Sequence, residues 1–80
     1  MLMEWNYKFA ADFKNLWVLR KNGKVQALFS FEPSVERMSR ALRMASDAVT
    51  MQIFQSRTSG IDCGWESVQS DWSDWPVITQ

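Results

Sequence analysis

The sequence predicts a small α+β domain, in which one principal helix covers one face of a four-stranded, mainly antiparallel sheet. Three observations lead to this prediction. Residues 16–31 contain two apolar runs around Asn22-Gly23, the pair best suited to a two-residue type I′ hairpin turn. Residues 3–9 alternate apolar and polar side chains, which is the period of a half-buried strand. After Pro33, the apolar residues follow helical spacing.

The size and composition of the chain indicate one intracellular domain over residues 1–80. A length of 80 residues is near the lower limit for a self-sufficient core, and a hydrophobic fraction of 46% is ample for a globular protein. The single cysteine excludes an intramolecular disulfide and favours a reducing, cytoplasmic compartment. No run approaches the roughly 20 apolar residues of a membrane span, and the N-terminus lacks the apolar core of a signal peptide.

Charge divides the chain into a basic body and an acidic C-terminal segment. Residues 1–57 hold all nine basic residues and five acids, a net charge of +4, whereas residues 58–80 hold four acids and no base, a net charge of −4. The acidic segment also contains three of the five tryptophans, whose exposure to water is unfavourable. We expect this segment either to fold back onto the basic body or to present its tryptophans to a partner.

The hairpin turn decides which side chains share a face of the sheet. With Asn22 and Gly23 in the turn, Val18 is expected opposite Ala27. One face of the ribbon is then apolar and belongs to the core: Leu16, Val18, Val25, Ala27, Phe29 and Phe31. The other face is mixed, and it carries Trp17, Leu19, Lys21, Lys24, Gln26 and Leu28.

A helix is expected from Pro33 to about Ser46, and a fourth strand from Val49 to Arg57. The apolar stripe of the helix consists of Val35, Met38, Ala41, Leu42, Ala45 and Val49. The proposed strand is rich in β-branched and apolar residues on both of its faces, which is typical of a strand inside a sheet. A right-handed crossover would place it parallel to the third strand and beside the first.

The C-terminal segment is expected to begin with a loop and to end with a short helix. Residues 56–64 are rich in serine, threonine and glycine, which favours a loop. Trp65, Val68 and Trp72 lie within a narrow arc of a helical wheel, so a short helix is predicted to end before Trp75-Pro76.

The sequence contains no combination of residues typical of an active site. The absence of histidine removes the commonest general base and the commonest metal ligand. Cys63 follows Asp62, whose carboxylate would raise the pKa of the thiol and oppose its activation as a nucleophile. One cysteine without histidine does not form the usual zinc ligand set, and the three glycines form no phosphate-binding loop. We therefore expect no enzymatic activity, no cofactor and no bound metal.

A small, tryptophan-rich chain without catalytic residues is typical of a protein that binds another protein. The candidate partner-binding residues in the acidic segment are Trp65, Asp71, Trp72, Asp74 and Trp75. Those on the mixed face of the hairpin are Trp17, Leu19, Lys21 and Lys24. Acids around tryptophans resemble phosphates around stacked bases, and such mimicry would let the segment occupy a basic nucleic-acid channel on another protein. The predicted function is a compact inhibitor or adaptor, similar in type to the virus-encoded proteins, including anti-CRISPR inhibitors, that block host nucleic-acid machines.

Two alternatives remain open at this stage. The first is a single-stranded nucleic-acid binder with a basic, aromatic sheet face, on which the stacking residues would be Trp5, Tyr7, Trp17 and Phe31. This alternative ranks below protein binding for two reasons. Arg40 and Arg43 each have an acid four residues away on the expected helix, so their charges would be paired within the helix. The neutral chain also lacks the basic surplus of most nucleic-acid-binding domains. The second alternative is a homodimer closed by exposed hydrophobic residues. No membrane partner is expected.

Overall fold

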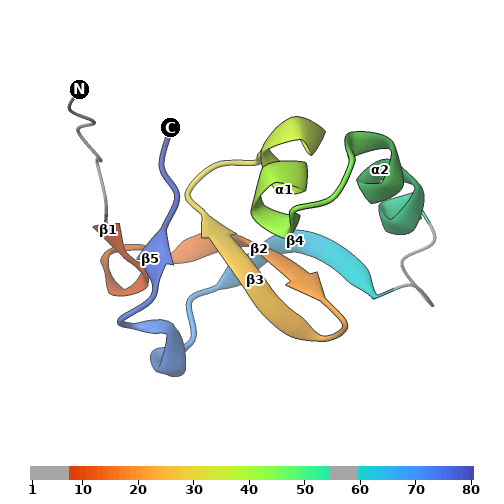
Figure 1. Ribbon diagram of the computed structural model, residues 1–80. Coiled ribbons are helices and arrows are strands. Elements are labelled where there is room, and N and C mark those ends of the chain that lie inside the picture. Colours follow the sequence, from red (N-terminus) through yellow and green to blue (C-terminus); the bar gives the residue numbers. More distant parts are fainter. Residues whose placement is uncertain (1–7, 55–59) are drawn as a thin grey trace.

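The computed structural model describes residues 8–54 and 60–80 and has an α+β fold (Figure 1). These ranges contain two α-helices, α1 (Val35–Leu42) and α2 (Ser46–Phe54), and neither is long and apolar enough to cross a membrane. The strands are β1 (Lys8–Phe9), β2 (Asn15–Lys21), β3 (Lys24–Phe29), β4 (Ile61–Ser67) and β5 (Pro76–Val77). The short 3-10 helices are η1 (Ala10–Asp12) and η2 (Ser70–Trp72).

A three-stranded antiparallel sheet has the order β3-β2-β4, and a separate antiparallel pair joins β1 to β5. The predicted α+β class is confirmed, but the single four-stranded sheet and the single helix are not.

The hairpin between β2 and β3 forms at the predicted place. Asn22 and Gly23 have φ angles of +53° and +79°, as a turn with two left-handed residues requires. Lys21 pairs with Lys24 and Arg20 pairs with Val25, which is the register that a two-residue turn at Asn22 and Gly23 requires.

A β-bulge changes the register beyond the first two pairs of this hairpin. The pairing shifts between Leu19 and Arg20, so that Leu19 lies opposite Ala27 and Gln26 is the extra residue of β3. The predicted composition of the two faces is therefore wrong from this point onward. Ala27 and Phe29 share a face with Leu19 and not with Val18.

Both faces of the three-stranded sheet are covered. Figure 1 shows α1 and α2 on the same side of the sheet. The buried core on this helical face consists of Leu19, Ala27, Phe29, Met38, Leu42, Val49 and Ile61. The opposite face packs against the two-stranded sheet and both 3-10 helices, and its buried residues are Ala10, Leu16, Val18, Leu28, Trp72 and Val77. The acidic C-terminal segment thus folds back onto the body of the protein.

Helix α1 starts two residues after Pro33, where it was predicted to begin, and ends earlier than predicted. Ser34 caps its N-terminus, because the Ser34 hydroxyl accepts a hydrogen bond of 3.2 Å from the Arg37 N–H. The helix ends at Leu42 because Arg43 adopts a left-handed conformation, with φ of +56°, which redirects the chain.

The segment predicted as the fourth strand is a second helix, α2. The β-branched residues that favoured a strand are accommodated in it, because Val49 is fully buried in the helical-face core and Ile53 packs against that core. The Thr50 hydroxyl donates a hydrogen bond of 3.0 Å to the Ser46 carbonyl within the helix. The expected crossover to a parallel strand is therefore absent, and the remainder of the predicted segment, residues 55–57, lies outside the described residues.

The third member of the main sheet is β4, in a region predicted as a loop followed by a helix. Ile61, Cys63 and Trp65 alternate with polar or small residues, which is the period of a strand, and β4 pairs with β2 along its whole length. Of the predicted C-terminal helix, only the single 3-10 turn η2 forms. The predicted first strand is described only at Lys8–Phe9, where it pairs with β5; residues 3–7 lie outside the described residues.

Candidate functional site

The outer edge of β4 has no strand beside it in the described part of the chain. β4 lies at the edge of the sheet, all seven of its residues pair with β2, and no strand within residues 8–54 and 60–80 pairs with its other side. The opposite edge is partly covered, because the Ile78 N–H donates to the Leu28 carbonyl at 2.8 Å and the Ser30 N–H donates to the Ile78 carbonyl at 3.0 Å. β4 also lacks the proline and lysine residues that often protect exposed edges. Its unpaired main-chain groups can therefore receive another strand.

Trp65 stands on this edge, exposed but held in place. It is 52% exposed, and its ring packs edge to face against Trp17, with ring centroids 5.5 Å apart and an interplanar angle of 88°. Such aromatic pairs contribute about 0.5–1.5 kcal/mol beyond the burial of area. Because the fold itself orders the Trp65 side chain, this side chain would lose little conformational entropy when a partner contacts it.

The face of β4 opposite to the Trp65 side chain is acidic. Glu66 forms an ion pair with Arg20, in which Nη2 of Arg20 lies 3.1 Å from Oε1 and Nη1 contacts Oε2. The hydrogen bond to Glu66 raises the pKa of Arg20, and the guanidinium lies 5.9 Å from the centroid of the Trp72 ring. Asp62 is exposed and is directly paired with Arg20 in the strand register. A single cation thus faces two carboxylates, and this part of β4 remains negatively charged.

Gly64 leaves open space between these two carboxylates. A Cβ atom at this position would meet no atom within 4 Å, and the backbone conformation is not left-handed. The fold therefore does not require glycine here. A glycine within a strand is common where another chain or a ligand approaches closely.

The structure separates the predicted partner-binding tryptophans. Trp17 and Trp65 meet on the helical face of the sheet, whereas Trp72, only 4% exposed, belongs to the core of the opposite face. Trp75 is 37% exposed and lies outside β4. Leu19 is fully buried beneath the helices. Trp72 and Leu19 are thus part of the core and are not offered to a partner by this fold.

The charged candidates for partner binding lie away from the part of the β4 edge that carries Trp65. Asp71 and Asp74 are exposed in and just after η2, and Lys21 and Lys24 face each other at the end of the hairpin. Sequence reasoning missed Gly64 as part of a site. The alternation of residues 61–66 was the available signal, because a strand at the C-terminal end of the chain places these residues on an edge.

The ion pairs expected along the helix do not form within the described residues. The ion pair found there joins Arg20 to Glu66. Arg43 terminates α1 and Asp47 belongs to α2, so these two residues do not share a helix. Arg40 is on α1 but has no carboxylate within ion-pairing distance among residues 8–54 and 60–80. The basic charge of α1 is therefore less neutralised than its sequence suggested.

The stacking residues proposed for nucleic acid do not form an open sheet face in the described part of the chain. Trp17 and Phe31 lie on the face that the helices cover, and each is half-buried. Trp5 and Tyr7 lie outside the described residues.

Cys63 is half-buried in β4, and its surroundings disfavour the thiolate. Burial is the main cause that raises the pKa of Cys63, and the charges of Asp62 and Glu32 act in the same direction. Residues 8–54 and 60–80 contain no group of three or more cysteine, aspartate or glutamate side chains that could hold a metal ion.

No protein-family model, curated protein or solved structure matches this chain.

Proposed function

We propose that the chain is a non-enzymatic protein-binding module, a small inhibitor or adaptor, that captures an extended segment of another protein as an additional strand beside β4. The observation that carries this proposal is the unpaired edge of β4 with the exposed, ordered Trp65 upon it. In binding by strand addition, main-chain hydrogen bonds supply affinity and the alternating side chains supply specificity.

The two faces of β4 define the chemistry of the partner segment. Side chains of an added strand alternate between the same two faces as those of β4. On one face they would contact Trp65, and on the other they would approach Asp62 and Glu66. The segment that fits best is therefore extended, with apolar residues alternating with lysine or arginine.

Charge disfavours a second copy of this chain as the partner strand. An antiparallel pairing of two β4 strands centred on Gly64 would place Asp62 of each copy opposite Glu66 of the other. Like charges directly opposite each other destabilise a strand pair. The complementary partner is thus a basic segment of a different protein.

A synthetic peptide of alternating lysine and valine tests this proposal, with a glutamate–valine peptide of the same length as its control. We expect the lysine peptide to bind and the glutamate peptide not to bind in isothermal titration calorimetry. Trp65→Ala should weaken binding by about 30-fold, the loss expected for an interface anchor that contributes about 2 kcal/mol. Asp62→Lys should also weaken binding, and it should reduce the dependence of the affinity on salt concentration.

The matched control is Trp75→Ala, which removes another partly exposed tryptophan that is not on β4. Its affinity for the lysine peptide should equal that of the unmodified protein. Equal binding of both peptides, or an equal loss in the two tryptophan variants, would refute strand addition at β4.

A further inference from the structure

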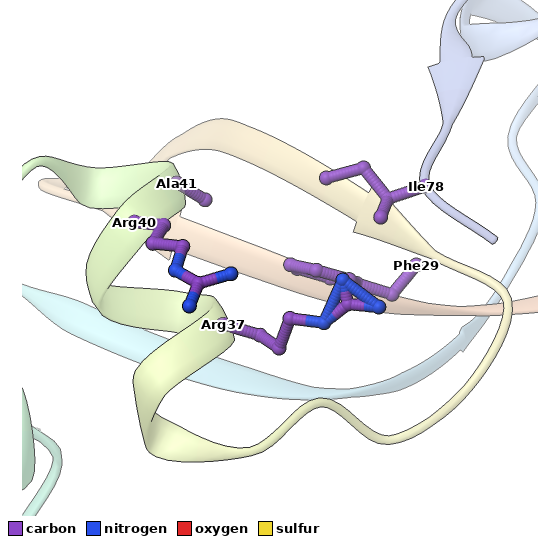
Figure 2. Close-up of a pocket in the computed structure, with 5 residues that line it drawn as sticks. All are labelled: Phe29, Arg37, Arg40, Ala41 and Ile78. Atoms are coloured by element: carbon purple, nitrogen blue, oxygen red, sulfur yellow. The ribbon is translucent and has the colours of Figure 1, made fainter. Parts of the chain in front are cut away.

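A second candidate site lies on the helical face of the sheet, near the edge opposite β4. A hollow of about 230 Å³ opens between α1, the end of β3 and the C-terminal segment, and its lining residues are Phe29, Arg37, Arg40, Ala41 and Ile78 (Figure 2). The sheet order β3-β2-β4 separates this hollow from the strand edge described above. Any ligand of the hollow would therefore bind independently of a partner strand.

The hollow is lined by two positive charges, those of Arg37 and Arg40. Figure 2 shows the side chains of Arg37 and Arg40 extending from α1 toward Phe29. Neither arginine forms an ion pair with a carboxylate within the described ranges of the chain. The guanidinium of Arg37 is also positioned by Phe31, whose ring centroid lies 5.3 Å away. Two neighbouring guanidinium groups without a carboxylate attract an anion, and their planar donor forks match the oxygens of a phosphate.

The remaining walls of the hollow are apolar and firmly placed. Ile78 is 38% exposed, and its main chain is hydrogen-bonded to Leu28 of β3 and to Ser30, which directly follows β3. Phe29 lies at the base, where its ring packs edge to face against Phe31 at a centroid distance of 5.8 Å. The hollow therefore combines a cationic side with an apolar side built from separate elements.

We propose that this hollow binds a phosphomonoester that carries a ring-sized apolar group. A phosphomonoester has a charge close to −2 at neutral pH, which matches two arginines, whereas a carboxylate supplies only half of that charge. The volume of about 230 Å³ is below the usual range of about 300–1,000 Å³ for a drug-sized ligand, so one ring with its phosphate fits better than a larger molecule.

Phenyl phosphate is the probe that tests this inference on the full chain. In ¹H–¹⁵N NMR spectra, it should shift the side-chain Nε–H signals of Arg37 and Arg40 and the amide signal of Ile78. Arg37→Gln and Arg40→Gln should each weaken binding by about tenfold, because each removes a charge-assisted contact to the phosphate. Arg43→Gln is the matched control, since Arg43 lies at the end of the same helix but does not line the hollow. It should bind phenyl phosphate as the unmodified protein does.

The probe also has chemical controls. Phenol lacks the anion and benzoate carries a single charge, so both should bind more weakly than phenyl phosphate. Equal binding of benzoate or phenol, or an equal loss of affinity in Arg43→Gln, would overturn the proposal, as would the absence of any shift at Arg40. Arg40 is exposed on the helix surface, so Arg40→Gln should fold normally and gives a result even if Arg37→Gln is destabilised. Trp65→Ala should retain phenyl phosphate binding, which separates this site from the β4 edge.

Discussion

Trp17 and Trp65 occupy directly paired positions on neighbouring strands, and their rings meet edge to face at a centroid distance of 5.5 Å. On its other side, Trp17 is paired with Phe29 of β3, so an aromatic row crosses all three strands of the sheet. The row begins in the buried core at Phe29 and ends at the exposed Trp65. This arrangement connects the exposed Trp65 to the buried core of the helical face.

The tryptophans of the C-terminal segment should therefore differ in their effects on stability. Trp72→Ala should lower the free energy of unfolding by about 3–5 kcal/mol, because Trp72 is buried in the core between the sheet and the C-terminal segment. Trp65→Ala should lower it by only about 1 kcal/mol, the value of an edge-to-face pair. Urea denaturation of both variants measures the two losses. Similar losses would show that Trp65 belongs to the core and is not a binding residue.

Gly23 and Gly64 provide a matched pair of glycine substitutions. Gly23→Val should destabilise the protein by about 1–3 kcal/mol, because valine resists the φ of +79° at the turn. Gly64→Val should cause no loss of stability, because the added side chain enters open space on a strand and valine favours strands. Thermal unfolding of the two variants tests the turn assignment. An unchanged melting temperature in Gly23→Val would contradict a left-handed conformation at this position.

The hairpin and α1 could be predicted because their signals are local. Asn22-Gly23 requires a tight turn whatever surrounds it, and Ser34 and Pro33 precede a clear helical stripe. The bulge at Gln26 could not be predicted, because no residue there has a special backbone requirement and the shift serves packing on both faces of the sheet. That one-residue shift was enough to move Ala27 to the other face.

The second helix and the edge strand show why local preference was insufficient elsewhere. Val49 and Ile53 have side chains that favour strands, but their burial against α1 and β4 outweighs differences in propensity of about 1 kcal/mol or less per residue. At the edge, the helical spacing of Trp65 and Trp72 concealed the strand alternation that begins at Ile61. The candidate site depends on which strand lies at the edge, and this order is set by long-range pairing.

The left-handed residue at the end of α1 offers a stabilising substitution. Arg43→Gly should raise the free energy of unfolding by about 0.5–1 kcal/mol, because Arg43 has φ of +56° and glycine adopts this conformation without steric strain. Arg40→Gly is the control inside α1, where glycine should lower stability by about 1 kcal/mol. Chemical denaturation of both variants shows whether each substitution raises or lowers the free energy of unfolding. A loss of stability in Arg43→Gly would show that α1 continues beyond Leu42.

Cys63 should react slowly with iodoacetamide at neutral pH. The thiolate is the reactive form, and burial together with the Asp62 charge raises the pKa of Cys63, so the thiolate fraction is small until the pH exceeds the usual thiol range. Asp62→Asn removes one of these causes and should speed the reaction, whereas Asp71→Asn, which changes an exposed acid outside β4, should not. Mass spectrometry measures the rate at which iodoacetamide alkylates Cys63. A native rate as fast as that of the unfolded chain would contradict the assigned environment of Cys63.

Amide hydrogen exchange, with and without the lysine–valine peptide, tests strand addition most directly. In an antiparallel edge strand, every second residue directs its N–H outward, so those amides of β4 exchange freely until another strand pairs with them. We expect the peptide to slow exchange at alternate residues of Ile61–Ser67 and to leave the exchange at α1 unchanged. Binding of the peptide without slowed exchange in β4, or with protection confined to another element, would contradict strand addition at β4.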